Sequence, residues 1–233
     1  EKFSTTPLFT SSQPQISEIV RVLPTWRSDK AGKIDEPAAW NAWMDRLAVA
    51  AGTPVRTWDD FLDAMDKRHA FFESRGCVVS DYGITEIFAA PYTTGEIKAI
   101  FRKVREGGVA TPAEAYKFKS AWLYEGLKAD AAANWTAQLH YNCLRGVNRK
   151  MNALLGPDTG FDMINTAKCG GEIAALLSAL NDTDECPKTI IYSLNPADFD
   201  QIGTILGCFQ SSEVPGKIQH GSAWWFNDHK IGM

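Results

Sequence analysis

The strongest constraint on the fold is an alternation, repeated along the chain, between short apolar runs and longer amphipathic stretches. Short runs rich in β-branched residues predict buried strands, whereas apolar residues at every third or fourth position predict helices. The predicted strands cover Ile19–Trp26, Cys77–Tyr82, Thr136–Asn142, Thr189–Leu194 and Ile218–Trp225. Because strands that alternate with helices favour βα units and a parallel sheet, the predicted fold class is α/β.

The stretches between these strands carry helix start signals. Thr111, Pro112 and Glu114 match a capping box with proline at the first helical position. The predicted helices cover Asp35–Ala51, Thr57–Arg75, Gly95–Glu106, Pro112–Ala133, Gly171–Leu180 and Pro196–Phe209. Two of these helices lie between the second and third strands, which predicts a helical insertion at about residues 84–134 of a single domain covering residues 1–233.

Charge and cysteine usage limit the classes of partner. The formal charge of −4 over 233 residues is too small an imbalance to favour nucleic acid or an acidic membrane surface. No apolar stretch reaches the ~18 residues that cross a bilayer, and the first residues lack the pattern of a signal peptide. Five scattered cysteines without a C-x-x-C pair indicate reduced thiols. These features predict a cytoplasmic protein with no nucleic-acid or membrane partner.

Candidate functional residues lie at the predicted strand ends, where parallel α/β folds place their chemistry. Arg27 and Arg145 are suited to binding a carboxylate bidentately, although either could instead pair with a neighbouring aspartate. His140 ends the third strand and could bind a metal or move a proton, or it could be a hydrogen-bonded core residue. His69 is expected to have a structural role. The aromatic run at 224–226 could stack on a sugar or pack in the core.

Several familiar motifs are absent. The sequence has no G-x-G-x-x-G, P-loop, H-E-x-x-H or G-x-S-x-G pattern, which argues against nucleotide binding, a zincin and a serine hydrolase. Longer strings are more informative: LPTWRSDK, GCVVSDYG, QLHYNCLRGVNRKMNALLGPDTGFDMIN, PKTIIYSLNPAD and PGKIQHGSAWWFNDHKIGM. Together and in this order, these strings resemble the uronate (glucuronate) isomerase family and cover most of residues 19–233.

The resemblance implies a distorted (β/α)₈ TIM barrel of the amidohydrolase superfamily, with added helices. It implies aldose–ketose isomerisation of D-glucuronate to D-fructuronate, and of D-galacturonate to D-tagaturonate, in hexuronate breakdown. It also implies a small-molecule hexuronate substrate and a divalent metal, zinc first, with manganese, iron or cobalt as alternatives. Such a reaction needs cations for the carboxylate and an acid–base group for the proton.

Individual roles follow from matching motif positions. The resemblance implies that His140 and Asp198 are catalytic, with His140 also a possible metal ligand. It implies that Arg27, Trp224 and Arg145 contact the substrate.

The chain departs from the family pattern in three respects, of which the first is Ser28 where proline is usual. The family has histidine where this chain has Tyr82, and Tyr82 is expected to contact substrate in its place. The family's H-x-H on the first barrel strand and the aspartate of its last strand have no match here. The five strands would then be barrel strands three to seven, with the main metal ligands outside this chain. We therefore expect a missing remainder of the barrel or a homo-oligomer.

Two other functions compete with the isomerase. One is a catalytically silent sugar-acid-binding remnant that keeps Arg27 and Trp224. The other is a metal-dependent hydrolase of the amidohydrolase type on the same barrel, because a shared fold alone does not choose the reaction.

Overall fold

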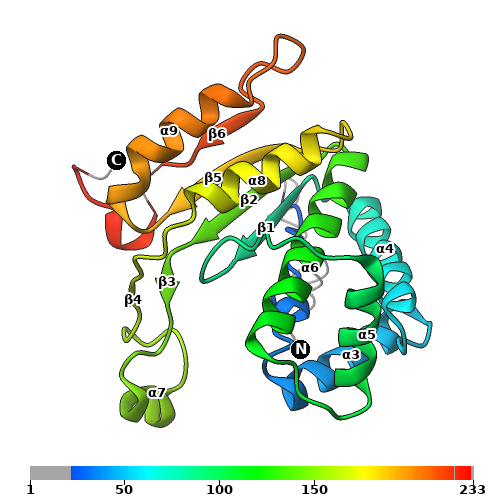
Figure 1. Ribbon diagram of the computed structural model, residues 1–233. Coiled ribbons are helices and arrows are strands. Elements are labelled where there is room, and N and C mark those ends of the chain that lie inside the picture. The colour runs from blue at the N-terminus through cyan, green and yellow to red at the C-terminus, as the bar shows by residue number, and fades with distance from the viewer. Residues whose placement is uncertain (1–21, 223, 232–233) are drawn as a thin grey trace.

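A four-stranded parallel sheet forms the centre of the molecule (Figure 1). The computed structural model describes residues 22–222 and 224–231. The sheet has the order β1 (Val79–Gly83), β2 (Thr136–Tyr141), β5 (Lys188–Ser193) and β6 (Ile218–His220). The four strands lie side by side in the order in which they occur in the chain, and every neighbouring pair is parallel. The α/β prediction with a parallel sheet is therefore confirmed.

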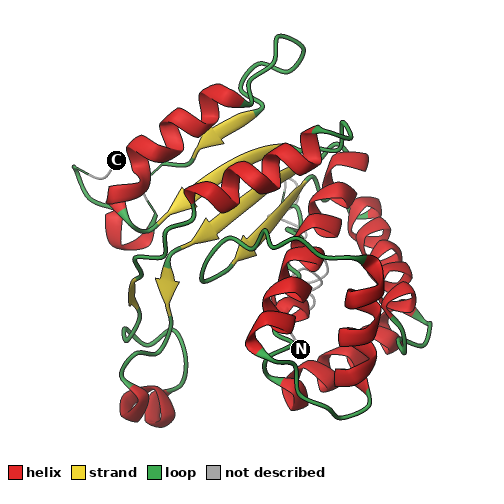
Figure 2. Cartoon of the chain, viewed as in Figure 1, coloured by secondary structure: helices red, strands yellow, loops and turns green. Residues whose placement is uncertain are grey.

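Helices cover one side of the sheet and extend beyond its β1 edge (Figure 2). Their bounds are α3 (Pro37–Ala51), α4 (Trp58–Ser74), α5 (Thr94–Arg105), α6 (Pro112–Ala132), α7 (Arg149–Leu155), α8 (Gly170–Asn181) and α9 (Phe199–Cys208), with 3₁₀ turns at Asp29–Gly32, Pro196–Asp198 and Trp225–Asn227. A small antiparallel hairpin, β3 (Cys143–Leu144) with β4 (Met163–Ile164), projects from the sheet and carries α7. We call residues 143–164 the arm.

Three predicted strands are confirmed within one or two residues, and two differ. Of the predicted first strand, residues 19–21 lie outside the described part, and Trp26 makes a single parallel bridge to Ser80. Pro24 lacks the N–H that a longer ladder would need. The last strand ends at His220, and Trp225–Asn227 of the predicted strand's end and beyond form a 3₁₀ turn instead.

Most of the predicted helices are present, and α4 and α6 begin at the capping residues that the sequence predicts. Thr57 with Asp60 and Thr111 with Glu114 each satisfy two backbone N–H groups, as does the unpredicted pair Thr93 and Glu96. The predicted helix at 196–209 is divided into a 3₁₀ turn and α9. The arm was not predicted from the sequence, because two-residue strands and one short helix carry little periodic signal.

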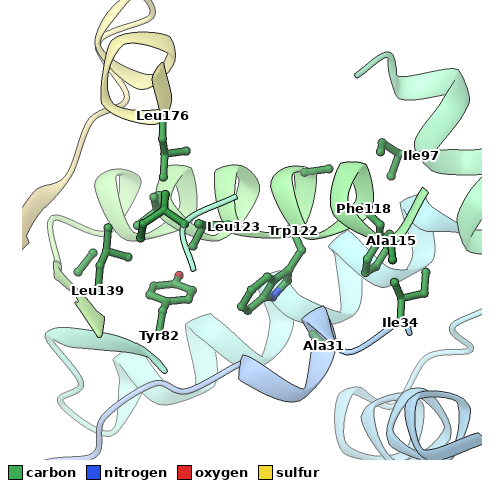
Figure 3. Close-up of a cluster of buried hydrophobic side chains, with 14 of the residues drawn as sticks. Ala31, Ile34, Tyr82, Ile97, Ala115, Phe118, Trp122, Leu123, Leu139 and Leu176 are labelled. Carbon is green, nitrogen blue, oxygen red and sulfur yellow. The ribbon is translucent and has the colours of Figure 1, made fainter. Parts of the chain in front are cut away.

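Successive residues of each strand point to opposite faces of the sheet. One face is fully buried against helices and includes Tyr82 and Leu139, which Figure 3 shows beside Trp122 and Leu123 of α6. The other face is only partly buried in β1, β2 and β5 and includes Asp81. The alternation thus separates a structural face from a face that is open to ligands.

A buried carboxylate joins the structural face to the helices. Asp130 of α6 is completely buried and accepts hydrogen bonds from Ser80 Oγ at 2.6 Å and Tyr82 Oη at 3.0 Å. His69 Nε2 lies 3.2 Å from the same carboxylate, and its ring stacks on Trp135 at 3.8 Å. His69 is therefore structural, as expected. Burial, followed by the charge of Asp130, raises the pKa of Tyr82 well above its ordinary value.

Two further findings bear on the expected environment. All five cysteines are free, and four of them are buried. None of the helices in the described residues combines the length and apolarity that crossing a bilayer requires.

Loss of the buried carboxylate should strongly destabilise the fold. Asp130→Ala would leave several buried donors without an acceptor, at roughly 1–3 kcal/mol for each such group. We expect urea denaturation to show a loss of at least about 3 kcal/mol. The matched control Asp63→Ala removes an exposed ion pair with Lys67 and should cost under about 0.5 kcal/mol. Equal midpoints for the two variants would contradict this account.

The capping box of α6 should contribute pH-dependent stability. The ammonium of Lys103, followed by the backbone N–H of Thr111, lowers the pKa of Glu114 from 4.5 to about 2. A depressed pKa stabilises the folded state above the unfolded pKa, and this contribution disappears as pH falls through the folded pKa. The stability difference between wild type and Glu114→Gln should therefore narrow between pH 4.5 and about 2. A difference that stays constant across this window would contradict the assignment.

Candidate active site

A cavity of about 280 Å³ opens at the carboxyl ends of β1 and β2. Its lining residues are Arg27, Asp81, Gly83, His140, Arg145, Asp158, Trp224 and Trp225. Another cavity, beside Trp26 and His69, has a volume of about 30 Å³, which suits about one water molecule rather than a substrate. Because the cavity at the strand ends is lined by His140, Asp81 and Arg27, it is the candidate active site.

A histidine–aspartate pair lies in this cavity. His140 Nδ1 is 2.7 Å from Asp81 Oδ1, and both side chains are largely shielded from solvent. The two residues come from neighbouring strands: Asp81 pairs with Gln138, and His140 is two residues further along β2 on the same face. Because an ionised carboxylate can only accept, this contact assigns the proton to Nδ1 and leaves Nε2 for a ligand or a proton transfer.

Aromatic rings fix the position of the imidazole. The His140 ring stacks on Tyr192 of β5, with centroids 4.1 Å apart and an interplanar angle of 9°. Trp224 contacts the same imidazole edge-on at 4.6 Å. The apolar surroundings and the carboxylate together hold one ring orientation.

Arg27 lies beside this pair and is half exposed. Its Nη2 donates to Asp29 Oδ2 at 3.0 Å, and its Nε lies 3.4 Å from Asp81 Oδ2. The Gly83 N–H donates to Asp29, and a Cβ on Gly83 would come within 2.6 Å of Arg27 Nη2. Burial raises the pKa of Asp29, while Arg27 opposes the shift. The guanidinium is thus held in place by carboxylates while part of it remains open to an anion.

Arg145 connects the cavity to the arm. Its Nη1 donates to Asp158 Oδ1 at 2.8 Å and to Asp162 Oδ2 at 3.0 Å. Its guanidinium lies over the Trp225 ring, 4.8 Å from the centroid. Asp162 also accepts from the Gly146 N–H, so the base of the arm is fixed next to the cavity. Each arginine therefore pairs with aspartate, which is one of the two alternatives, and each also lines the cavity, while binding of a carboxylate stays a prediction.

The structure brings together four of the predicted site residues and separates the other two. His140, Arg27, Arg145 and Trp224 line one cavity. Tyr82 does not contact it, because strand alternation directs Asp81 into the cavity and Tyr82 into the buried structural face. Tyr82 therefore does not stand in the cavity in place of a histidine, and the prediction that it contacts substrate there is wrong.

Asp198 also lies outside the cavity lining. Its carboxylate is buried and accepts from Ser193 Oγ at 2.6 Å and Asn142 Nδ2 at 2.7 Å. Tyr141 Oη donates to it at 3.1 Å, and Asn195 Nδ2 at 3.3 Å. All these partners connect the ends of β2 and β5. The geometry gives Asp198 a bracing role instead of the expected catalytic contact.

Sequence reasoning did not nominate Asp81 or Tyr192 for the site. Asp81 could have been found from strand periodicity, since residue 81 alternates with the apolar positions of its run. Tyr192 carried no such signal, because its place beside His140 depends on the register between β2 and β5.

The side chains present do not form a complete metal site. Among residues 22–222 and 224–231, no group of three or more His, Cys, Asp or Glu side chains could hold a metal ion. His140 could offer at most Nε2, since Asp81 occupies Nδ1.

Comparison with known proteins identifies the family of this chain. A family model described as glucuronate isomerase matches residues 10–233. A uronate isomerase of Lachnospira eligens is 49% identical over 214 residues, covering 92% of this chain and 46% of that protein. A uronate isomerase of Phocaeicola vulgatus is 46% identical with the same coverage. The chain spans about half the length of the curated relatives it matches.

Solved structures of uronate isomerases share the fold of this chain. The uronate isomerase of Thermotoga maritima superposes with a TM-score of 0.83 at 29% identity, over 94% of this chain and 47% of that one. The glucuronate isomerase of Caulobacter crescentus, at 23% identity, has a TM-score of 0.80 over 91% of this chain and 43% of that one, which supports the shared fold. On the match across residues 10–233 and the identity to these relatives, the chain belongs to the glucuronate (uronate) isomerase family.

Proposed function

We propose that this chain carries part of the active site of a uronate isomerase, which interconverts D-glucuronate and D-fructuronate, and D-galacturonate and D-tagaturonate. The observation that carries the proposal is the His140–Asp81 pair, set between two arginines and two tryptophans in one cavity. A hexuronate has a carboxylate, a proton to be moved and an apolar sugar face, and each has a partner among these residues.

The histidine–aspartate pair would move the proton. Isomerisation removes a proton from C2 of the open-chain aldose and delivers one to C1, while the hydroxyl proton moves from O2 to O1. His140 Nε2 is free to accept or donate in these steps, and Asp81 stabilises the imidazolium that forms on proton uptake. This assignment requires Nε2 to reach the C1–C2 edge of the sugar.

The arginines would hold the other end of the substrate. Arg27 and Arg145 lie in the same cavity as His140, and guanidinium binds planar carboxylates through two parallel hydrogen bonds. Trp224 offers an apolar face for the C–H groups of the sugar. Binding of the carboxylate by arginine would place C1 and C2 toward His140.

We further propose that the rest of a (β/α)₈ barrel of the amidohydrolase type comes from polypeptide outside this chain. The four strands lie in sequential parallel order, as in a barrel wall, and the relatives are about twice as long. The divalent metal that the resemblance implies, zinc first, would need ligands from that remainder, since the described donors do not form a site alone. A homo-oligomer and a cytoplasmic location also stay proposals; the free cysteines favour the latter.

Two alternatives remain distinguishable from this proposal. A silent remnant would bind a hexuronate without converting it, and a hydrolase of the same superfamily would need a different substrate bond. The His140–Asp81 pair favours a reaction over mere binding, because a binding pocket has no need of an oriented proton carrier.

Substitution of the histidine pair should reduce turnover with little effect on binding. In the native assembly, His140→Gln should lower kcat for D-glucuronate by about 10²–10⁴-fold, as expected for loss of a general acid–base group. Asp81→Asn should also lower kcat, because an amide can favour the wrong imidazole tautomer. The control His220→Gln alters a histidine that packs on Phe199, outside the cavity. Full activity of His140→Gln would contradict the proposed chemistry.

Substitution of the arginine should instead weaken substrate binding. Arg27→Ala should raise KM for D-glucuronate by about 30-fold, equivalent to about 2 kcal/mol of charge-assisted hydrogen bonding. Arg46→Ala, at an exposed arginine of α3, serves as the control. The steady-state kinetics of both variants provide the test, and an unchanged KM for Arg27→Ala would remove Arg27 from the substrate site.

A further inference from the structure

Four positions lie in one row across the carboxyl end of the sheet. The register aligns Gly83 of β1 with His140 of β2, and His140 with Tyr192 of β5. On the β6 side, His220 is aligned with Ile191, so Gly221 comes next to Tyr192. The row therefore reads glycine, histidine, tyrosine, glycine from β1 to β6.

The second glycine leaves room for the tyrosine ring. A Cβ on Gly221 would lie less than 3.0 Å from three atoms of the Tyr192 ring. The φ of Gly221 is not in the left-handed region, so the demand for glycine at this position comes from space. The Gly221 N–H donates to the Ile191 carbonyl at 2.9 Å, which keeps this backbone from retreating.

The opposite side of the tyrosine ring bears on the imidazole. Tyr192 and His140 are nearly parallel at 9°, with centroids 4.1 Å apart. Tyr192 Oη donates to Gln138 Oε1 at 3.3 Å, which restrains the far end of the ring. The phenol is therefore held between a glycine backbone and the His140 ring.

We infer that Tyr192 and Gly221 are positioning residues that set the ring plane of His140 and so the direction in which its Nε2 meets the substrate. Asp81 fixes which nitrogen carries the proton, but one hydrogen bond leaves the ring free to tilt about it. The stack on Tyr192 removes that tilt. The effect on turnover rests on the proposed isomerase function, whereas the ring orientation itself does not.

Tyr192 is suited to positioning and poorly suited to proton transfer. Burial, followed by the charge of Asp81, raises the pKa of its phenol above the ordinary value of 10.0. The ring therefore stays neutral wherever His140 would work, and it acts on the reaction only through the imidazole.

The test compares three variants by two measurements. Gly221→Ala would displace the Tyr192 ring by roughly 1.5 Å to restore ordinary carbon–carbon contact, and would press it on His140. Tyr192→Leu removes the stack but keeps an apolar side chain. Tyr192→Phe keeps the stack and loses only the hydrogen bond to Gln138, so it is the matched control.

Proton and nitrogen-15 NMR of the imidazole in the native assembly report its orientation and its tautomer. Wild type and Tyr192→Phe should show a single Nδ1–H tautomer for His140, with ring protons shifted upfield by the stacked phenyl group. Gly221→Ala and Tyr192→Leu should both keep the Nδ1–H tautomer, because Asp81 still accepts that proton. The upfield shift should grow in Gly221→Ala and vanish in Tyr192→Leu, and in both the through-space contacts of the His140 ring with Trp224 should change, with the rest of the amide spectrum preserved. If Gly221→Ala does not fold, Tyr192→Leu decides the outcome. Unchanged contacts between the His140 ring and Trp224 in folded Tyr192→Leu would overturn the inference.

Kinetics in the native assembly supply the second readout. Gly221→Ala should lower kcat by up to about 100-fold, with KM within about threefold, because misplacing a catalytic group by about 1 Å has an effect of this size. Tyr192→Phe should stay within about twofold of wild type. If Gly221→Ala instead raises KM and leaves kcat unchanged, Tyr192 contacts the substrate, and the positioning role is overturned. If wild type converts no hexuronate, the proposed function fails, while the NMR result still decides the positioning.

Discussion

The two-residue period of the parallel strands is the constraint on which both the core and the candidate site depend. In β1, Tyr82 faces the helices and Asp81 faces the cavity, and a shift of one residue would exchange them. The buried Asp130 makes such a shift costly, because it accepts from Ser80 and Tyr82 on the structural face. Structural hydrogen bonds on one face thereby fix the position of Asp81 on the other.

Charge balance explains how a cavity can hold two arginines before substrate arrives. Arg27 is paired with Asp29 and Asp81, and Arg145 with Asp158 and Asp162. These pairs orient the guanidinium groups, yet both side chains remain half exposed. An incoming carboxylate would add to an existing arrangement instead of ordering a mobile side chain, which lowers the entropic cost of binding.

Local sequence patterns predicted the helices and strands that depend on neighbouring residues. They did not predict the positions of side chains whose contacts come from distant segments. The capping box at Thr111 and Glu114 and the strand at 136–141 follow from short-range sequence. The prediction for Tyr82 was wrong because the family motif does not show which face of β1 a residue occupies, whereas the two-residue alternation of the strand does. The role predicted for Asp198 was wrong because partners such as Asn142, which follows β2, are distant in the sequence. Family resemblance correctly brought His140 together with Arg27, Arg145 and Trp224, although these residues are far apart in the chain.

The chain matches about half of each relative, so its cavity would be one side of the proposed reaction centre. The central claim is that this side transfers a proton between adjacent carbons of a hexuronate. The most direct measurement is proton NMR of D-glucuronate incubated in deuterated water with the protein in its native assembly. The account predicts ketose formation with solvent deuterium in the newly formed C–H bond. Binding of the sugar acid to folded protein without any conversion would contradict it.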